Sequence, residues 1–189
     1  DPLFEESTKK ITSIIPALIK KNVIPVITGY IGATKTGEIT TLGRGGSDFS
    51  ATIIGYCLDA SEVWIWTDVD GVMTADPKIV KDAKTIPRIS YNEGAELSYF
   101  GAKVLHPRTL VPAATKKIPV WIKNSFNPQA RGTEIAYDRQ GNGYGVKAIT
   151  SFKGLSLMTL QGKGMMSVPG TAAKLFSALA ERGINVMFI

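Results

Sequence analysis

The 189-residue sequence contains a single cysteine and a single histidine, and these shortages exclude several kinds of site. Cys57 has no partner for a disulfide within the chain, and zinc sites need more cysteine or histidine ligands than the chain holds, so we predict no metal site built from these residues. Cys57 lies in the apolar stretch IIGYCLDA and is expected to be a small core residue. His106 precedes a proline and is expected to be a packing residue, which argues against a histidine-based catalytic triad.

Long hydrophobic runs are also missing. No stretch of 18 apolar residues occurs, and the first ten residues, DPLFEESTKK, lack the apolar core of a signal peptide. The sequence therefore predicts neither a membrane span nor a secretory signal, and a cytoplasmic location fits best. The formal charge is +6, but the lysines are scattered in pairs on amphipathic segments. Solvated faces are the better interpretation, because nucleic-acid-binding motifs are absent. We expect no nucleic-acid or membrane partner.

Apolar residues are plentiful, at 44% of the chain, and their spacing alternates between helical and strand patterns. Strands that alternate with helices predict an α/β fold, a three-layer αβα arrangement around a mostly parallel sheet. The helices are expected at 11–21 and 47–59, after the capping-box sequence Ser90-Tyr91-Asn92-Glu93, and from Pro107 onward; the buried strands are expected at 23–30, 63–66 and 118–124.

The character of the sequence changes near residue 140. DRQGNGYG is rich in glycine and predicts a linker at 141–150 between a first domain at 1–140 and a second at 151–189. The second part is expected to contain a strand at 155–160, a helix at 169–182 and a strand at 184–189. One such βαβ unit of about forty residues cannot cover both of its faces. We therefore expect either a fragment or a domain completed by another chain.

The stretch TLGRGGSDFSA, residues 41–51, predicts an anion site. A glycine-rich turn before a helix collects free backbone amides and the positive end of the helix dipole. Arg44 can bind a carboxylate with two hydrogen bonds, Asp48 can orient a cation, and Ser47 or Asp48 is expected near the N-cap. The alternative is that the glycines form only a tight turn.

Two other stretches are candidates for ligand binding. In WTDVDGVMTADP, Thr67 and Asp68 stand at the carboxyl end of a strand, where open α/β sheets bind ligands, although a solvated turn is the alternative. In YFGAKVLHP, Lys103 either binds a phosphate or complements the dipole at the end of a helix.

Taken in order, four runs resemble the aspartate kinases of the amino acid kinase family: TLGRGGSDFSA, WTDVDGVMTADP, AELSYFGAKVLHPRTL and IPVWIKNSFNPQARGTEI. They cover nearly all of residues 22–136. The segment from 154 to 189 resembles the first half of the ACT regulatory domain that follows the kinase domain in this family. The domain expected at 1–140 is then the C-terminal part of a kinase domain.

The resemblance implies phosphoryl transfer from ATP, with Mg²⁺ on its phosphates, to the side chain of L-aspartate, the first step in making lysine, threonine and methionine. It implies that Arg44, Gly45, Gly46 and Ser47 hold aspartate and that Asp48 is catalytic, organising lysines around the transferred group. It assigns the nucleotide to Thr67, Asp68, Met73, Lys78, Lys103 and Val104. The family's N-terminal lysine-and-glycine motif is absent, so we expect this chain alone to be inactive. Met73 and Lys78 replace a frequent tyrosine and arginine, which weakens those two assignments.

For the ACT-like part, the resemblance implies a small amino-acid effector, lysine or threonine, near Ser167 and Gly170, and a homo-oligomer formed through these domains. The strand INVMFI has no acidic residue to meet the ammonium group of lysine, which favours threonine. A pairing surface without a ligand is the alternative there. For the chain as a whole, the alternatives are another amino acid kinase or a regulatory, amino-acid-binding module without catalysis.

Overall fold

A four-stranded sheet organises the first of two units into which the chain divides, residues 1–152 and 153–189. The computed structural model describes residues 1–101, 105–137, 145–151, 153–162 and 168–189. The strand order is β3 (Val63–Thr67), β5 (Val120–Asn124), β6 (Thr133–Ala136) and β4 (Arg88–Ser90). The pairs β3–β5 and β4–β6 are parallel and β5–β6 is antiparallel, so the mostly parallel α/β sheet is confirmed.

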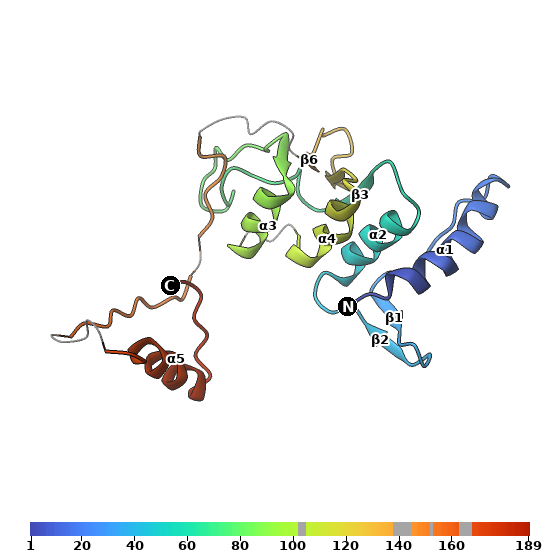
Figure 1. Cartoon of the computed structure of the whole chain (residues 1–189). Coiled ribbons are helices and arrows are strands. Elements are labelled where there is room, and N and C mark those ends of the chain that lie inside the picture. The colour runs from blue at the N-terminus through green and yellow to red at the C-terminus, as the bar shows by residue number, and fades with distance from the viewer. Residues whose placement is uncertain (102–104, 138–144, 152, 163–167) are drawn as a thin grey trace. The chain divides into compact units, whose positions relative to one another are not determined.

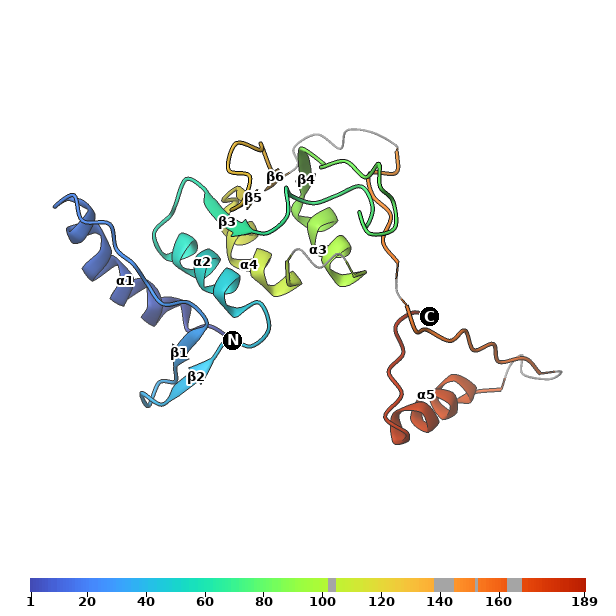
Figure 2. The same cartoon turned by 180° about the vertical axis from the view of Figure 1, so that it is seen from behind.

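Three helices lie along one face of this sheet (Figures 1 and 2): α2 (Gly46–Cys57), α3 (Tyr91–Tyr99) and α4 (Pro107–Lys116). Strand residues that point toward the helices form the core, among them Ile65, Val120 and Ile135. On the other face, Trp64 and Trp66 remain 48% and 45% exposed. The strand predicted at 63–66 is therefore buried only at alternate residues, as a pleated strand with one covered face requires.

The starts of α3 and α4 follow from local sequence. Ser90 Oγ accepts a hydrogen bond from the Glu93 amide at 3.2 Å, and Glu93 Oε2 accepts one from the Ser90 amide at 2.8 Å, which is the predicted capping box. Pro107 occupies the first turn of α4, as predicted, and His106 is its N-cap. Each helix start is thus fixed by residues at or next to its own first turn, Ser90 and Glu93 for α3 and His106 and Pro107 for α4.

The N-terminal region agrees with the sequence in part. Helix α1 (Phe4–Ile19) forms and packs on α2, where the ring of Phe4 lies against that of Tyr56 in a tilted arrangement. Thr8 contacts Cys57. Cys57 is 1% exposed and is therefore a core residue, as predicted. The strand predicted at 23–30 is wrong, because residues 23–29 join no ladder and Val26 is 95% exposed. A strand needs a neighbouring backbone to bond, and the described residues provide none there. Instead, β1 (Ile31–Ala33) and β2 (Ile39–Thr41) form a hairpin.

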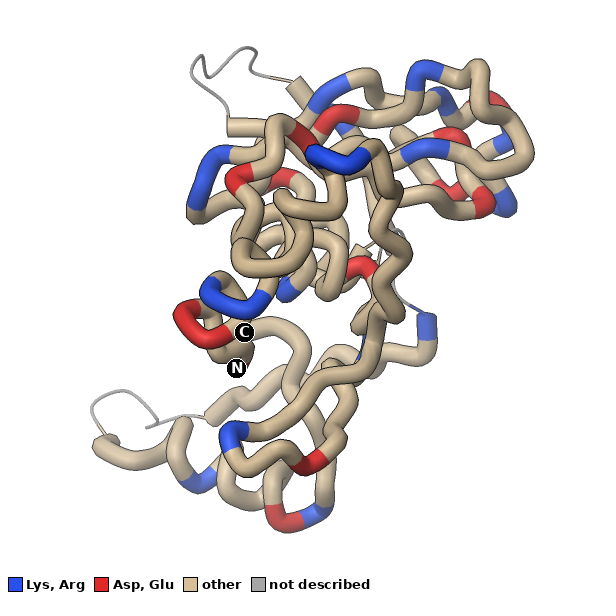
Figure 3. Tube along the Cα trace, turned by 90° about the vertical axis from the view of Figure 1, so that its right-hand side faces the viewer, with Lys and Arg blue, Asp and Glu red and all other residues tan. Residues whose placement is uncertain are grey.

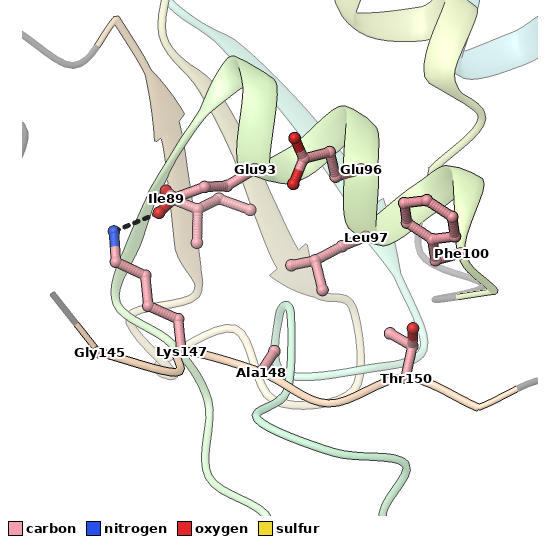
Figure 4. A pocket seen from close by; sticks show the side chains of 9 residues that line it. All are labelled: Ile89, Glu93, Glu96, Leu97, Phe100, Gly145, Lys147, Ala148 and Thr150. Carbon is pink, nitrogen blue, oxygen red and sulfur yellow. Dashed lines mark ion pairs between the residues drawn. The ribbon is translucent and has the colours of Figure 1, made fainter.

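Residues 145–150 pack against α3 in the first unit (Figure 4). Lys147 Nζ lies 2.6 Å from Glu93 Oε1, and the Ile149 amide donates to the Thr74 carbonyl at 2.9 Å. Burial opposes ionisation of Glu93, but the hydrogen bonds from Lys147 and Ser90 outweigh it and hold the pKa of Glu93 below its usual value. The capping glutamate of α3 is thereby tied to the segment that leads toward the second unit.

The second unit contains α5 (Thr171–Glu181), which confirms the helix predicted at 169–182, and Gly183 follows it in a left-handed conformation. The strands predicted at 155–160 and 184–189 are not formed, since neither segment takes part in a ladder. Leu157 is 96% exposed, which shows that this apolar segment lacks a covering partner among the described residues. Each predicted strand depends on pairing that the local sequence does not supply.

The sequence also predicts neither a membrane span nor a nucleic-acid partner. Across the described ranges, no helix combines the length and apolar character needed to cross a membrane. Lysines and arginines are spread along the trace of the first unit with acidic residues between them (Figure 3). This distribution fits solvated faces better than a single basic binding patch.

Tyr91 provides a test of the core. Its hydroxyl donates to the Ile118 carbonyl at 2.5 Å, and burial, with a smaller repulsion from Glu134, raises the pKa of Tyr91 to about 12. We expect Tyr91→Phe to lower the free energy of unfolding by about 1–3 kcal/mol in urea titrations, because a buried carbonyl loses its donor. Tyr99→Phe, at a residue that is 55% exposed, is the control. Equal stability of Tyr91→Phe and wild type would show that this hydrogen bond does not stabilise the core.

Candidate active site

The glycine turn, residues 43–46, leads directly into α2. Gly43 and Gly45 have φ values of 77° and 71°, a left-handed conformation that glycine adopts without strain. Gly45 is the N-cap, and Ser47 and Asp48 follow it in the first turn of α2, near the N-cap as predicted. Because Gly45 has no side chain to cap the helix, the amides of Ser47 and Asp48 have no acceptor within the described residues. These free amides can bind an anion.

Backbone segments approach each other closely beside the turn. A Cβ atom on Gly46 would lie 2.7 Å from Tyr30 Cδ2, and one on Gly29 would lie 3.1 Å from Ser47 Cα. Ser50 joins the two segments, since its Oγ accepts from the Tyr30 amide at 2.9 Å and donates to the Gly46 carbonyl at 2.8 Å. Glycine at these two positions is therefore required by packing.

An open pocket of about 480 Å³ lies over the turn, and Tyr30 and residues 43–48 line it. All five residues assigned to the aspartate site, Arg44, Gly45, Gly46, Ser47 and Asp48, are thus brought together. Sequence analysis missed Tyr30 and Ser50, whose roles depend on contacts across about twenty residues. Ser50 is part of the SDFS run of the motif, which was the available sequence signal. Its burial on α2 becomes evident only in the structure.

The pocket contains both positive and negative groups. The N-terminus of α2 and Arg44 favour a negatively charged ligand. Asp48 lies in the first turn of α2, and partial burial raises the pKa of its carboxyl above the usual value. The pocket can therefore hold a carboxylate or phosphate on its amides while Asp48 faces an accompanying cation.

The start of helix α4 packs against the turn and does not line the pocket. A Cβ atom on Gly45 would lie 2.9 Å from His106 Cβ and 3.7 Å from Thr109 Oγ1. Thr109 is fully buried, and its hydroxyl has no hydrogen-bond partner among the described residues. Leaving a buried hydroxyl unpaired costs about 1–3 kcal/mol. Sequence analysis missed Thr109, since nothing local indicates that it meets a turn more than sixty residues earlier.

The second candidate region is the loop after β3. Thr67 Oγ1 donates to Asp68 Oδ1 at 3.1 Å at the strand's carboxyl end. Asp70 accepts hydrogen bonds from the side-chain amides of Asn124 at 2.8 Å and Asn127 at 3.2 Å. These bonds hold the loop to the end of the neighbouring strand β5.

Four further contacts fix the course of this loop. A Cβ on Gly71 would lie 2.5 Å from Thr133 Oγ1, which accepts from the Val72 amide at 2.8 Å. Met73 Sδ accepts a hydrogen bond from Thr85 Oγ1 at 3.4 Å, and the Lys78 amide donates one to Asp76 Oδ1 at 2.9 Å. Thr67, Asp68, Met73 and Lys78 therefore belong to one continuous segment. They do not line the pocket over the glycine turn.

Topology places both regions at one edge of the sheet. Helix α2 connects to β3 through a short turn and packs on it, so the start of α2 lies at the same end as Thr67. Helix α4 connects in the same way to β5, which places His106 at that end too. This is the carboxyl end of the parallel strands β3 and β5, where α/β sheets bind ligands.

Three assigned residues, Lys103, Val104 and Ser167, lie outside the described residues. Gly170 is the N-cap of α5, with φ of 86°. No cluster of three histidine, cysteine, aspartate or glutamate side chains is arranged for a metal ion in the described ranges. Asp48 in the first region and Asp68 in the second provide carboxylate oxygens.

Comparison with known proteins identifies two families along the chain. Residues 3–124 match the family model for the amino acid kinase family, and residues 158–189 match that of the ACT domain. The bifunctional aspartokinase/homoserine dehydrogenase of Haemophilus influenzae is 44% identical over 185 residues, which are 98% of this chain and 22% of that protein. Chloroplastic aspartokinase 1 of Arabidopsis thaliana is 44% identical over 164 residues, 86% of this chain and 29% of that protein.

Solved structures give the same result. Escherichia coli aspartokinase III in complex with lysine and aspartate matches with a TM-score of 0.77 and 34% identity, over 98% of this chain and 41% of that one. The same enzyme in complex with aspartate and ADP matches with a TM-score of 0.72 and 37% identity, over 100% and 42%. The chain thus spans between a fifth and a third of the two curated relatives and less than half of these two structures.

The raised pKa of Asp48 predicts a stability effect. Burial disfavours its ionised form, so the stabilising contribution of the carboxyl is present below its unfolded-state pKa and is lost as the pH rises through the folded-state value. We expect Asp48→Asn to melt at a higher temperature than wild type at pH 7 and at the same temperature below about pH 3.8. Asp82→Asn, at an exposed aspartate, is the control. A lower melting temperature for Asp48→Asn at pH 7 would contradict this account of the pocket.

Proposed function

The chain belongs to the amino acid kinase family, and from that premise we propose that it provides the C-terminal part of the kinase domain of an aspartate kinase, which phosphorylates the side chain of L-aspartate with ATP. The observation that carries the proposal is the pocket over the glycine turn, where free amides and Arg44 meet at the carboxyl edge of the sheet. Identity of 44% with aspartokinases over nearly the whole chain supports the choice of substrate.

The proposed reaction needs positioning more than proton transfer. A side-chain carboxylate oxygen of aspartate forms a bond to the γ-phosphorus of ATP, and the bond from that phosphorus to the β-phosphate bridging oxygen breaks. ADP leaves, and 4-phospho-L-aspartate remains. Because aspartate is already ionised at neutral pH, no general base is required. The protein's contribution is to hold two anions close together and to offset their charge.

In this proposal the glycine turn holds the phosphoryl acceptor. Arg44 binds the α-carboxylate of aspartate through two hydrogen bonds, and the backbone of Gly45, Gly46 and Ser47 completes the site. Asp48 carries no proton in the reaction and instead orients the cations that surround the transferred group. Its partial burial beside an anion site fits that role, since an unaccompanied carboxylate there is disfavoured.

The nucleotide is assigned to the loop after β3, through Thr67, Asp68, Met73 and Lys78, together with Lys103 and Val104. The bonds from Asn124 and Asn127 to Asp70 support this, because they keep the loop in one conformation at the correct edge of the sheet. Mg²⁺ usually binds through one or two carboxylates plus phosphate oxygens, and Asp48 and Asp68 are of the right chemistry for that. When bound, it would neutralise charge on the ATP phosphates.

The ACT-like segment suggests regulation by an amino acid. Escherichia coli aspartokinase III has been solved with lysine and aspartate bound, and residues 158–189 of this chain match the ACT domain. We propose lysine or threonine as effector, with Ser167 and Gly170 receiving its carboxylate, and pairing of ACT domains in a homo-oligomer.

The single buried cysteine is consistent with a cytoplasmic setting.

Activity is tested in the full-length gene product by measuring ADP formation with and without L-aspartate, and by trapping the acyl phosphate with hydroxylamine. The proposal requires ADP release that depends on aspartate, together with the hydroxamate of aspartate. Turnover with L-glutamate or a nucleoside monophosphate, but not with aspartate, would instead assign another amino acid kinase. ADP binding without any turnover would favour the regulatory module.

Arg44 is the residue whose replacement separates the two substrates. Arg44→Lys keeps the charge but loses the planar pair of donors, so we expect the KM for aspartate to rise about tenfold or more, which corresponds to a loss of roughly 1.5–3 kcal/mol, while the KM for ATP stays unchanged. Arg131→Lys, at an exposed arginine, is the matched control. A rise in the KM for ATP alone would reverse the division of the site.

A further inference from the structure

A buried hydroxyl lies beside the glycine turn, and one carbonyl of the turn is free of hydrogen bonds from the described residues. Thr109 Oγ1 is 3.7 Å from the position that a Cβ atom on Gly45 would occupy, and this hydroxyl is fully buried and has no partner among the described residues. On the turn itself, the Gly43 carbonyl accepts from the Gly46 amide and the Gly45 carbonyl accepts from the Phe49 amide. The Arg44 carbonyl receives no hydrogen bond from any residue that the structure describes.

The hydroxyl is unpaired for a local reason. A threonine within a helix commonly donates to the carbonyl four residues earlier, and here that residue is Leu105, which precedes the first residue of α4. Thr115 on the same helix makes this bond, to the Val111 carbonyl at 2.8 Å. Thr109 sits too near the helix start to do so, and it faces the turn instead.

Peptide geometry links this hydroxyl to the pocket. In a trans peptide the N–H and the C=O point in opposite directions, and no described peptide is cis. When the Gly45 amide points toward an anion in the pocket, the Arg44 carbonyl of the same peptide points away from the pocket, and Thr109 is a neighbour of this peptide that does not line the pocket. Gly45 has a positive φ and no Cβ, so this peptide can rotate at low cost.

We propose that Thr109 is a positioning residue for the amino-acid substrate: its hydroxyl donates to the Arg44 carbonyl when the Gly45 amide binds the substrate carboxylate. The inference rests on the proposed function, because it deepens the assignment of this pocket to aspartate. The hydroxyl is unpaired without substrate and paired with it. Part of the affinity for aspartate therefore comes from a residue that the substrate does not touch.

The test compares three variants of the full-length gene product. Thr109→Val has nearly the same shape but no hydroxyl, and Thr109→Ser keeps the hydroxyl. The control is Thr52→Val, because Thr52 is equally buried but its hydroxyl already donates to the Phe49 carbonyl at 3.1 Å. The readouts are the melting temperature without substrate, kcat, and the KM for aspartate and for ATP.

We expect Thr109→Val to melt about 2–4 °C higher than wild type, since it no longer buries an unpaired hydroxyl. Its KM for aspartate should rise about three- to tenfold, with kcat and the KM for ATP unchanged, because the lost bond forms on substrate binding. Thr109→Ser should restore the aspartate KM. Thr52→Val should melt lower than wild type and keep the wild-type KM.

A wild-type aspartate KM in Thr109→Val would overturn the inference and leave the proposed function intact. A raised KM that Thr109→Ser does not restore would also overturn it, because the effect would then come from packing. If wild type itself shows no turnover with aspartate, the proposed function fails, and the inference fails with it.

Discussion

The close contact of the glycine turn with its surroundings is the constraint on which the rest of the site depends. Tyr30 packs closely against Gly46, and His106 packs closely against Gly45. Any side chain at either glycine would push α2 away from the segment at 29–30 or from α4. The contacts fix the start of α2 at the carboxyl edge of the sheet, and thereby fix the direction in which its free amides point.

Several features around this turn favour ligand binding at the expense of stability. The N-cap has no side chain, partial burial raises the pKa of Asp48, and the buried hydroxyl of Thr109 has no partner among the described residues. Elsewhere in the unit buried polar groups are paired, as in the bonds of Thr133 to Val72 and Ile86 and the capping box at the N-terminus of α3. Unfavourable polar groups that gather at one place in an otherwise satisfied fold are typical of a functional site.

What sequence analysis predicted correctly depended on short-range signals. The capping box at Ser90, Pro107 at the start of α4 and the glycine turn can each be identified within a few residues. The strands expected at 23–30, 155–160 and 184–189 failed because strand formation requires a neighbour that apolar spacing does not specify. Ser47 and Asp48 were correctly expected near the N-cap of α2. The N-cap itself is Gly45, which has no side chain to cap the helix, so the amides of Ser47 and Asp48 have no acceptor within the described residues.

The candidate site shows the same limit. Its five turn residues were predicted because they are contiguous, whereas Tyr30, Ser50 and Thr109 reach the turn only through the tertiary fold. Lys103, Val104 and Ser167 remain expectations from family resemblance.

The central claim, that the glycine turn binds the phosphoryl acceptor and the loop after β3 binds the nucleotide, is tested most directly by amide NMR spectra during separate titrations. The account predicts that L-aspartate shifts the amide resonances of Gly45, Gly46 and Ser47, and that ADP with Mg²⁺ shifts those of Thr67 and Asp68. If ADP instead moved the turn amides and aspartate moved the loop, the division of the site proposed here would be wrong.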